Sequence, residues 1–169
     1  MISLIVAFAK NNVIGKDGKI PWNIEGEQSR FKELTTNNIV IMGRKTFEEI
    51  YQKLQKPLPN RINIVISKTK KYDFENCFTF VSLDAALDFC KKTFPQKDIF
   101  ISGGAALYQK ALPIVEKMYI TEIALEVPGD TFFPKFSKDD FICEEEIPVK
   151  SNVDFVYKTY RRRWLFFFC

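Results

Sequence analysis

The segment Ile39-Val40-Ile41-Met42-Gly43-Arg44-Lys45-Thr46 joins an apolar strand to the start of a helix. Its first four residues form a run without a polar position, which indicates a strand that is covered on both faces. Gly43 interrupts the run, and the residues after it have the pattern of a helix over 44–54. Uninterrupted apolar strands that are separated by helices are typical of parallel sheets in α/β proteins.

The same alternation continues on both sides of this segment. We expect helices at residues 25–35, 44–54, 83–93 and 105–111, and strands at residues 2–9, 39–42, 62–66, 99–101, 118–123, 141–147 and 153–161. No convincing helix separates the last three strands, so we expect them to form an antiparallel edge. The predicted fold class is α/β with a mixed sheet, whose ligands bind beyond the carboxyl ends of the strands.

The composition is that of one globular domain, with 46% apolar and 27% charged residues in a chain of 169. The net charge of +4 does not favour nucleic acid as a partner, but it suits a small anionic ligand. The apolar N-terminus lacks a basic segment and a cleavage site, so we expect it to be a strand rather than a signal peptide.

Cysteine usage favours a reducing compartment. The chain has four cysteines without CxxC spacing, and it has no histidine. We therefore expect neither a metal site nor a disulfide framework, and we expect a cytoplasmic location.

The C-terminus departs from this ordinary pattern. Arg161-Arg162-Arg163 is followed by six apolar residues, Trp164–Cys169. This apolar tail is far shorter than the roughly 20 residues that span a bilayer, so no transmembrane segment is expected. The tail has three ordinary interpretations: an aggregation-prone appendage, a sequence artefact or an extra docked strand. A more specific interpretation is a basic-aromatic anchor at a membrane surface.

Among the acidic residues, Glu27 gives the clearest indication of a functional site. If residues 25–35 are helical, Glu27, Phe31 and Leu34 lie on one apolar face. A buried and unpaired carboxylate costs several kcal/mol, so Glu27 needs a cationic or hydrogen-bonding partner. Since the chain lacks histidine, proton chemistry near neutral pH requires a shifted carboxylate, Lys, Tyr, Cys or water.

Three basic or glycine-rich segments follow strands and indicate an anionic ligand. Arg44 and Lys45 begin a helix, where free N–H groups and the helix dipole attract phosphate. Ser102-Gly103-Gly104 separates a strand from a helix and matches neither of the common nucleotide fingerprints. Ser67-Lys68-Thr69-Lys70-Lys71 follows another strand. Taken singly, Arg44 and Lys45 are equally consistent with a solvated basic turn, and the glycine pair is often only a tight turn. The segment Ser67–Lys71 by itself is more typical of a solvated charge run.

Arg61 follows the stiff segment Pro57-Leu58-Pro59-Asn60, which suits a guanidinium that binds a carboxylate in bidentate fashion. The alternative is an ordinary surface arginine. Together these features favour an anionic nucleotide and a smaller ligand that meets a buried acid.

From the first strand to about Arg162 the chain closely resembles the dihydrofolate reductase family. The resemblance rests on motifs in the family's order: Val13-Ile14-Gly15, Ile20-Pro21-Trp22, Glu27 with Phe31, Ile41–Thr46, Pro57–Arg61, Ile101–Gly104, Tyr108, Tyr119-Ile120-Thr121 and Gly129–Pro134. It implies one domain over residues 1–163, with an eight-stranded, mostly parallel mixed sheet, an antiparallel C-terminal edge and about four flanking helices.

The resemblance also implies an activity, the NADPH-dependent reduction of 7,8-dihydrofolate to tetrahydrofolate. Hydride would pass to pterin C6, and ordered water would protonate N5. Glu27 would bind the pterin, Thr121 would hydrogen-bond Glu27, and Trp22 would order water beside them. Antifolates would bind at the same site, and a monomer is the expected state.

The remaining site residues are likewise implied by position. The substrate would be bound by Ile5, Ala7, Glu27, Phe31, Lys32, Ile50, Lys56, Arg61, Ser102 and Thr121. The cofactor would be bound by Ala7, Ile14, Gly15, Ile20, Gly43, Arg44, Lys45, Thr46, Ser67, Lys68, Gly103, Gly104, Ala105, Ala106, Leu107 and Tyr108, and the loop Val13–Ile20 would close over the nicotinamide.

Three positions depart from the commoner pattern. Glu27 stands where many bacterial members have Asp, Gln28 where an apolar residue is frequent, and Ser102 where Ile, Val or Leu is usual. Gln28 and Ser102 are expected to weaken diaminopyrimidine inhibitors. The alternatives to a dihydrofolate reductase are a reductase of similar fold in riboflavin synthesis and a catalytically silent nucleotide-binding protein.

Overall fold

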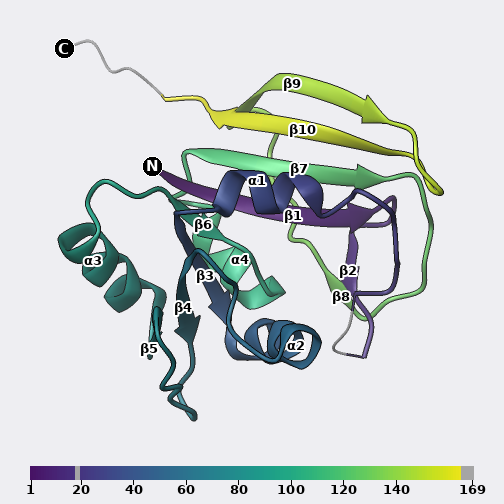
Figure 1. Ribbon diagram of the computed structural model, residues 1–169. Helices are drawn as coiled ribbons and strands as arrows, with labels where there is room; N and C mark the ends of the chain where they lie inside the picture. The colour runs from purple at the N-terminus through teal and green to yellow at the C-terminus, as the bar shows by residue number, and fades with distance from the viewer. Residues whose placement is uncertain (18–19, 165–169) are drawn as a thin grey trace, which may run out of the picture.

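The computed structural model describes residues 1–17 and 20–164, which form a mixed sheet flanked by helices (Figure 1). Eight strands make up the sheet, in the order β5 (Cys77–Phe80), β4 (Ile62–Ile66), β3 (Ile39–Gly43), β6 (Ile99–Ile101), β1 (Ile2–Ala9), β7 (Lys117–Ile123), β10 (Phe155–Arg162) and β9 (Phe141–Val149). The strands from β5 to β7 are parallel, whereas β10 pairs antiparallel with β7 and β9. The predicted mixed sheet with an antiparallel C-terminal edge is therefore confirmed.

Three strands were absent from the expected elements. β5 is a four-residue edge strand, and β2 (Val13–Gly15) pairs with β8 (Thr131–Phe132) in a separate small ribbon. These segments are too short to show a periodicity of their own, so tertiary pairing decides their conformation.

Three of the four helices in the described part of the chain have the predicted bounds, namely α2 (Arg44–Leu54), α3 (Leu83–Thr93) and α4 (Ala105–Ala111). The prediction of a helix from residue 25 was wrong, because α1 runs only over Ser29–Thr35. Gly26 has a φ of +79°, a left-handed conformation that cannot belong to a right-handed helix. Turns closed by the amides of Glu27 and Ser29 precede α1, so Glu27 lies in a turn and not on a helical face.

The helices cover both faces of the sheet, and alternate strand residues divide the core accordingly. Ile39 and Ile41 pack in the cluster that contains α3 and α4 side chains. Val40 and Met42 pack on the opposite face with Phe47 of α2. This burial on both faces explains why β3 is apolar at every position before Gly43.

Backbone contacts join the carboxyl ends of β3 and β6. The Gly43 amide donates to the Gly103 carbonyl at 2.8 Å, and the Ser102 amide donates to the Ile41 carbonyl at 2.9 Å. The two strand–helix junctions that the sequence singled out therefore lie side by side.

The C-terminal tail falls mostly outside the described part of the chain. Trp164 is exposed, and residues 165–169, on which the interpretations of the tail depend, lie outside the described residues. Among the described helices, none has the length and apolar character needed to cross a membrane.

Candidate active site

Glu27 lies in a pocket of about 440 Å³ between the turn that precedes α1 and the end of α2. The pocket is lined by Ile20, Trp22, Asn23, Ile24, Gly26, Glu27, Gln28, Ser29 and Lys53. Burial raises the pKa of Glu27 to about 7, and the nearby positive charge of Lys53 opposes this increase only partly. A carboxyl group with this pKa changes protonation near neutral pH, and it is therefore one of the groups through which a chain without histidine can carry out acid–base chemistry.

Two buried polar atoms, one in this pocket and one directly after β6, have no protein partner. Neither Trp22 Nε1 nor Ser102 Oγ has a hydrogen bond among the residues that the structure describes. Because buried polar groups are nearly always satisfied, these atoms are suited to contacts with water or a bound ligand. Trp22 thus fits the predicted role of ordering water beside Glu27.

The predicted pterin-binding residues of the sheet lie on neighbouring strands. Ala7 of β1 pairs in register with Thr121 of β7, and Ile5 pairs with Tyr119 two positions earlier. Thr121 is buried, but the hydrogen bonds of the described residues include none between its side chain and Glu27. Phe31 of α1 and Ile50 of α2 are partly buried and pack against the core cluster on one face of the sheet.

Arg61 is the most buried cation among the predicted substrate-binding residues, with 8% of its surface exposed. Its Nε donates to the Pro59 carbonyl at 2.8 Å, its Nη1 donates to Thr35 Oγ1 at 3.3 Å, and its guanidinium lies 5.9 Å from the Phe31 ring centroid. Burial lowers its pKa, and no ion pair within the described residues offsets the buried charge. A ligand carboxylate would supply the missing counter-charge.

Lys32 and Lys56, predicted to lie near Arg61, are both exposed. The structure gives neither residue an ion pair among the described residues. Their exposure distinguishes them from Arg61, whose guanidinium is buried and hydrogen-bonded to Pro59 and Thr35.

The glycine pair after β6 has no side chains, so a ligand can approach the backbone closely there. The Gly103–Gly104 peptide bond is cis, and Gly103 has a φ of +111°. A Cβ atom at Gly103 would lie 3.2 Å from the ring of Tyr108, whose hydroxyl donates to the Ile5 carbonyl at 2.8 Å. A side chain at Gly103 would therefore be strained and would crowd Tyr108, while Gly104 is followed directly by α4.

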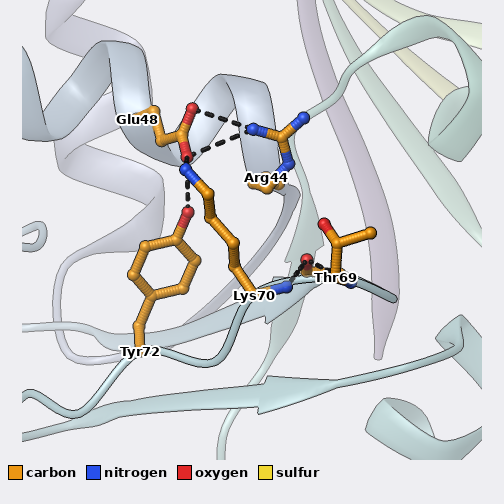
Figure 2. A network of polar contacts seen from close by, with 6 residues as sticks. Arg44, Glu48, Thr69, Lys70 and Tyr72 are labelled. Carbon is orange, nitrogen blue, oxygen red and sulfur yellow. Dashed lines mark hydrogen bonds and ion pairs between the residues drawn. The ribbon is translucent and has the colours of Figure 1, made fainter.

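Glu48 of α2 binds the basic groups at the start of α2 and in the segment after β4, as Figure 2 shows. Its carboxylate accepts hydrogen bonds from Arg44 at 3.1 and 3.2 Å, from Lys70 at 3.1 Å and from the Tyr72 hydroxyl at 2.7 Å. These donors lower the pKa of Glu48 to about 2, whereas burial and the Glu48 carboxylate raise that of Tyr72 to about 12. Ser67 Oγ accepts hydrogen bonds from the Thr69 and Lys70 amides and so shapes the turn after β4.

The other predicted cofactor residues fall into three places. Lys45 and Lys68 are exposed near the network just described, and Thr46 follows in the first turn of α2. Ala105, Ala106, Leu107 and Tyr108 form the first half of α4. Ile14 and Gly15 belong to β2, and Ile20 donates its amide to Glu49 Oε1 at 3.3 Å. The predicted closing loop also contains residues 18 and 19, which lie outside the described residues.

A family model described as dihydrofolate reductase matches residues 1–162. The chain belongs to the dihydrofolate reductase family.

Individual members of the dihydrofolate reductase family match nearly as much of the chain. A dihydrofolate reductase of Staphylococcus haemolyticus is 38% identical over 168 residues, which are 95% of each chain. One of Haemophilus influenzae is 40% identical over 142 residues, 84% of each chain. The structure also superposes on dihydrofolate reductase from Enterococcus faecalis, complexed with NADP(H) and RAB-propyl, with a TM-score of 0.85, 31% identity and 96% coverage of both chains.

Sequence reasoning missed three residues that shape this reductase site. Glu48 lies four residues after Arg44, so the spacing of an i,i+4 ion pair could have identified it. Arg30 and Tyr157 gave no comparable signal, because they meet only through tertiary packing, with the Arg30 guanidinium 5.0 Å from the Tyr157 ring centroid.

Proposed function

We propose that this protein catalyses the NADPH-dependent reduction of 7,8-dihydrofolate to 5,6,7,8-tetrahydrofolate. Its membership of the dihydrofolate reductase family supports the activity. The observation that carries the proposal is Glu27, an acid whose burial in a pocket raises its pKa to about 7. An uncompensated buried carboxyl destabilises the fold. A catalytically silent nucleotide-binding protein would gain no function that offsets this cost, so the acid favours an enzyme.

Glu27 is the proposed partner of the pterin ring. Its carboxylate would accept hydrogen bonds from the ring nitrogen and the 2-amino group, which would satisfy the buried acid. Trp22 would order water through its unpartnered Nε1, and Thr121 would bind the same water from the sheet. The walls of the site would come from the apolar residues Ile5, Ala7, Phe31 and Ile50, with Ser102 as the one polar member.

Arg61 is the proposed anchor for the glutamate part of the substrate. Its Nε and Nη1 atoms are already committed to Pro59 and Thr35, which orients the guanidinium before a ligand arrives. Such preorganisation reduces the entropy lost on binding, so the α-carboxylate can be held with little rearrangement. Lys32 and Lys56 would add charge at the mouth of this site.

NADPH is the proposed reductant, and it supplies a hydride when bound. Arg44, Lys45, Thr46, Ser67 and Lys68 would hold its phosphates, and the additional 2′-phosphate would favour NADPH over NADH. Gly43, Gly103, Gly104 and Ala105 would contact the pyrophosphate, followed by Ala106, Leu107 and Tyr108 of α4. Ala7, Ile14, Gly15 and Ile20 would enclose the nicotinamide.

Glu27 would lie too far around the bound pterin ring to donate a proton to N5, so we assign that role to ordered water at Trp22. The ionised form of Glu27 would make the bound ring more basic, and exclusion of bulk water would strengthen that effect. Glu27 thus acts by binding and polarising the substrate rather than by donating to N5 itself.

One spectrophotometric assay tests the proposal. Purified protein is mixed with NADPH, with and without 7,8-dihydrofolate, and the loss of NADPH absorbance is followed. We expect oxidation only when dihydrofolate is present, and none with a ribosylaminopyrimidine, whose reducible sugar group is the substrate type of the riboflavin-pathway alternative. NADPH oxidation with the aminopyrimidine alone would replace this proposal by that alternative.

We further propose that residues 1–163 form the catalytic unit and that it acts as a monomer in the cytoplasm. The described cysteines support a reducing compartment, since Cys77, Cys90 and Cys143 are all free thiols.

A further inference from the structure

The loop between β9 and β10 contacts the segment that carries Glu27, although more than 120 residues separate them in sequence. Asn152 Oδ1 accepts from the Glu25 amide at 3.0 Å, and Asn152 Nδ2 donates to the Asn23 carbonyl at 3.2 Å. The Ser151 hydroxyl donates to the Glu25 carbonyl at 2.8 Å. These contacts hold the backbone on the N-terminal side of Gly26.

Tyr157 of β10 holds the same segment on its other side. Its hydroxyl donates to the Gly26 carbonyl at 3.0 Å and lies 3.4 Å from the Glu27 carbonyl. Gly26 is left-handed and the helix begins only at Ser29, so no regular secondary structure holds Glu27 in place. The orientation of this acid therefore depends on tertiary contacts to its backbone.

Arg30 fixes the ring of Tyr157. Its guanidinium lies between the rings of Tyr119 and Tyr157, at 5.1 and 5.0 Å from their centroids. It also donates to the carbonyls of Ile120 and Lys158, at 3.4 and 3.2 Å, and so joins α1 to both β7 and β10. A tyrosine held in this way is a rigid support for a hydrogen bond to the turn.

We infer that Ser151, Asn152 and Tyr157 form a clamp that positions Glu27 for the pterin ring. The three are positioning residues, because they contact the backbone of residues 23–27 and act through Glu27. The inference rests on the proposed function and adds that the C-terminal hairpin determines dihydrofolate affinity. It predicts that weakening the clamp impairs dihydrofolate binding but leaves the NADPH site, built from β3, β4 and β6, unaffected.

The test compares Tyr157→Phe with Tyr119→Phe. Each variant removes one hydroxyl from a ring that flanks Arg30, but only that of Tyr157 bonds to the Glu27 segment among the described contacts. KM for dihydrofolate, KM for NADPH and kcat are measured for both variants and the parent, after thermal unfolding has verified that each is folded. Asn152→Ala gives a second, independent measurement from the loop side of the clamp.

For Tyr157→Phe and Asn152→Ala we expect KM for dihydrofolate to rise about threefold to tenfold, with KM for NADPH unchanged, as is usual for the loss of one or two hydrogen bonds. Tyr119→Phe should match the parent. Parent-like kinetics in both clamp variants would overturn the inference, as would equal increases in both KM values or an equal effect of Tyr119→Phe. A parent enzyme that does not oxidise NADPH with dihydrofolate would instead overturn the proposed function.

Discussion

The carboxylate of Glu48 binds the guanidinium of Arg44 through both of its oxygens, at 3.2 and 3.1 Å. Arg44 is also a residue to which we assign the cofactor's phosphate. One negative charge thus lies within the cationic group that would attract an anion, and the pKa of Glu48, about 2, keeps it ionised throughout the neutral range.

Glu48→Gln should therefore strengthen NADPH binding. Glutamine keeps the size of the side chain and an acceptor for Tyr72, but it removes a charge that repels the 2′-phosphate. We expect Kd for NADPH to fall about threefold at low salt, as for a partly exposed charge pair, and the difference to shrink as salt screens the interaction. Kd for NADH, which lacks this phosphate, should not change. Fluorescence titration at two salt concentrations measures both, and equal changes for the two cofactors would contradict the charge argument.

Glu27→Gln should abolish most of the activity while leaving the fold intact. Glutamine cannot carry the negative charge that would polarise the pterin, so turnover at neutral pH should fall by about two to four orders of magnitude. Glu33→Gln, at an exposed acid on α1, is the matched control and should have normal turnover. Steady-state NADPH oxidation measures both, and near-normal turnover of Glu27→Gln would contradict the assigned role.

The same substitution should stabilise the protein at alkaline pH. Because burial raises the folded-state pKa of Glu27 from 4.5 to about 7, the folded protein binds more protons than the unfolded chain between these values. The contribution of Glu27 to stability is therefore fully present below pH 4.5 and is lost as pH rises through about 7. We expect Glu27→Gln to exceed the parent in free energy of unfolding by about 1 to 3 kcal/mol at alkaline pH and to match it in acid. Urea unfolding at both pH values measures this, and a constant difference would contradict it.

Arg61→Lys should weaken binding of the substrate's glutamate. Lysine cannot reproduce the planar fork that Pro59 and Thr35 hold in place, so KM for dihydrofolate should rise about tenfold or more. Dihydropteroate, which lacks the glutamate, separates this effect from general damage, because its KM should be the same in parent and variant. Arg161→Lys, at an exposed arginine of β10, controls for the substitution itself.

Ser102→Ile should strengthen binding of diaminopyrimidine inhibitors. Ser102 Oγ is buried without a partner among the described residues. Because the side chain of serine is small and polar, it offers a ligand little apolar contact. Restoring an aliphatic side chain should add about 1 kcal/mol of binding free energy, or roughly a fivefold lower inhibition constant. Inhibition constants of parent and variant measure the effect, and equal values would reject it.

The sequence by itself determined the fold class, because strands that are apolar at every position require cover on both faces. β3 and its junction with α2 show this most directly, since the run from Ile39 to Met42 is fully buried and α2 begins at Arg44 as predicted. The motif spacing also determined the family and drew attention to Glu27.

Only the tertiary structure decided how Glu27 is held. The sequence pattern suggested a helix, but the left-handed Gly26 leaves Glu27 in a turn whose backbone is bound by residues of the β9–β10 hairpin. Likewise, Lys70 and Tyr72 meet Glu48 only because the segment after β4 folds back over α2. Such contacts are invisible in the sequence because local periodicity records which residues are buried, whereas the geometry of a site depends on segments that the fold brings together.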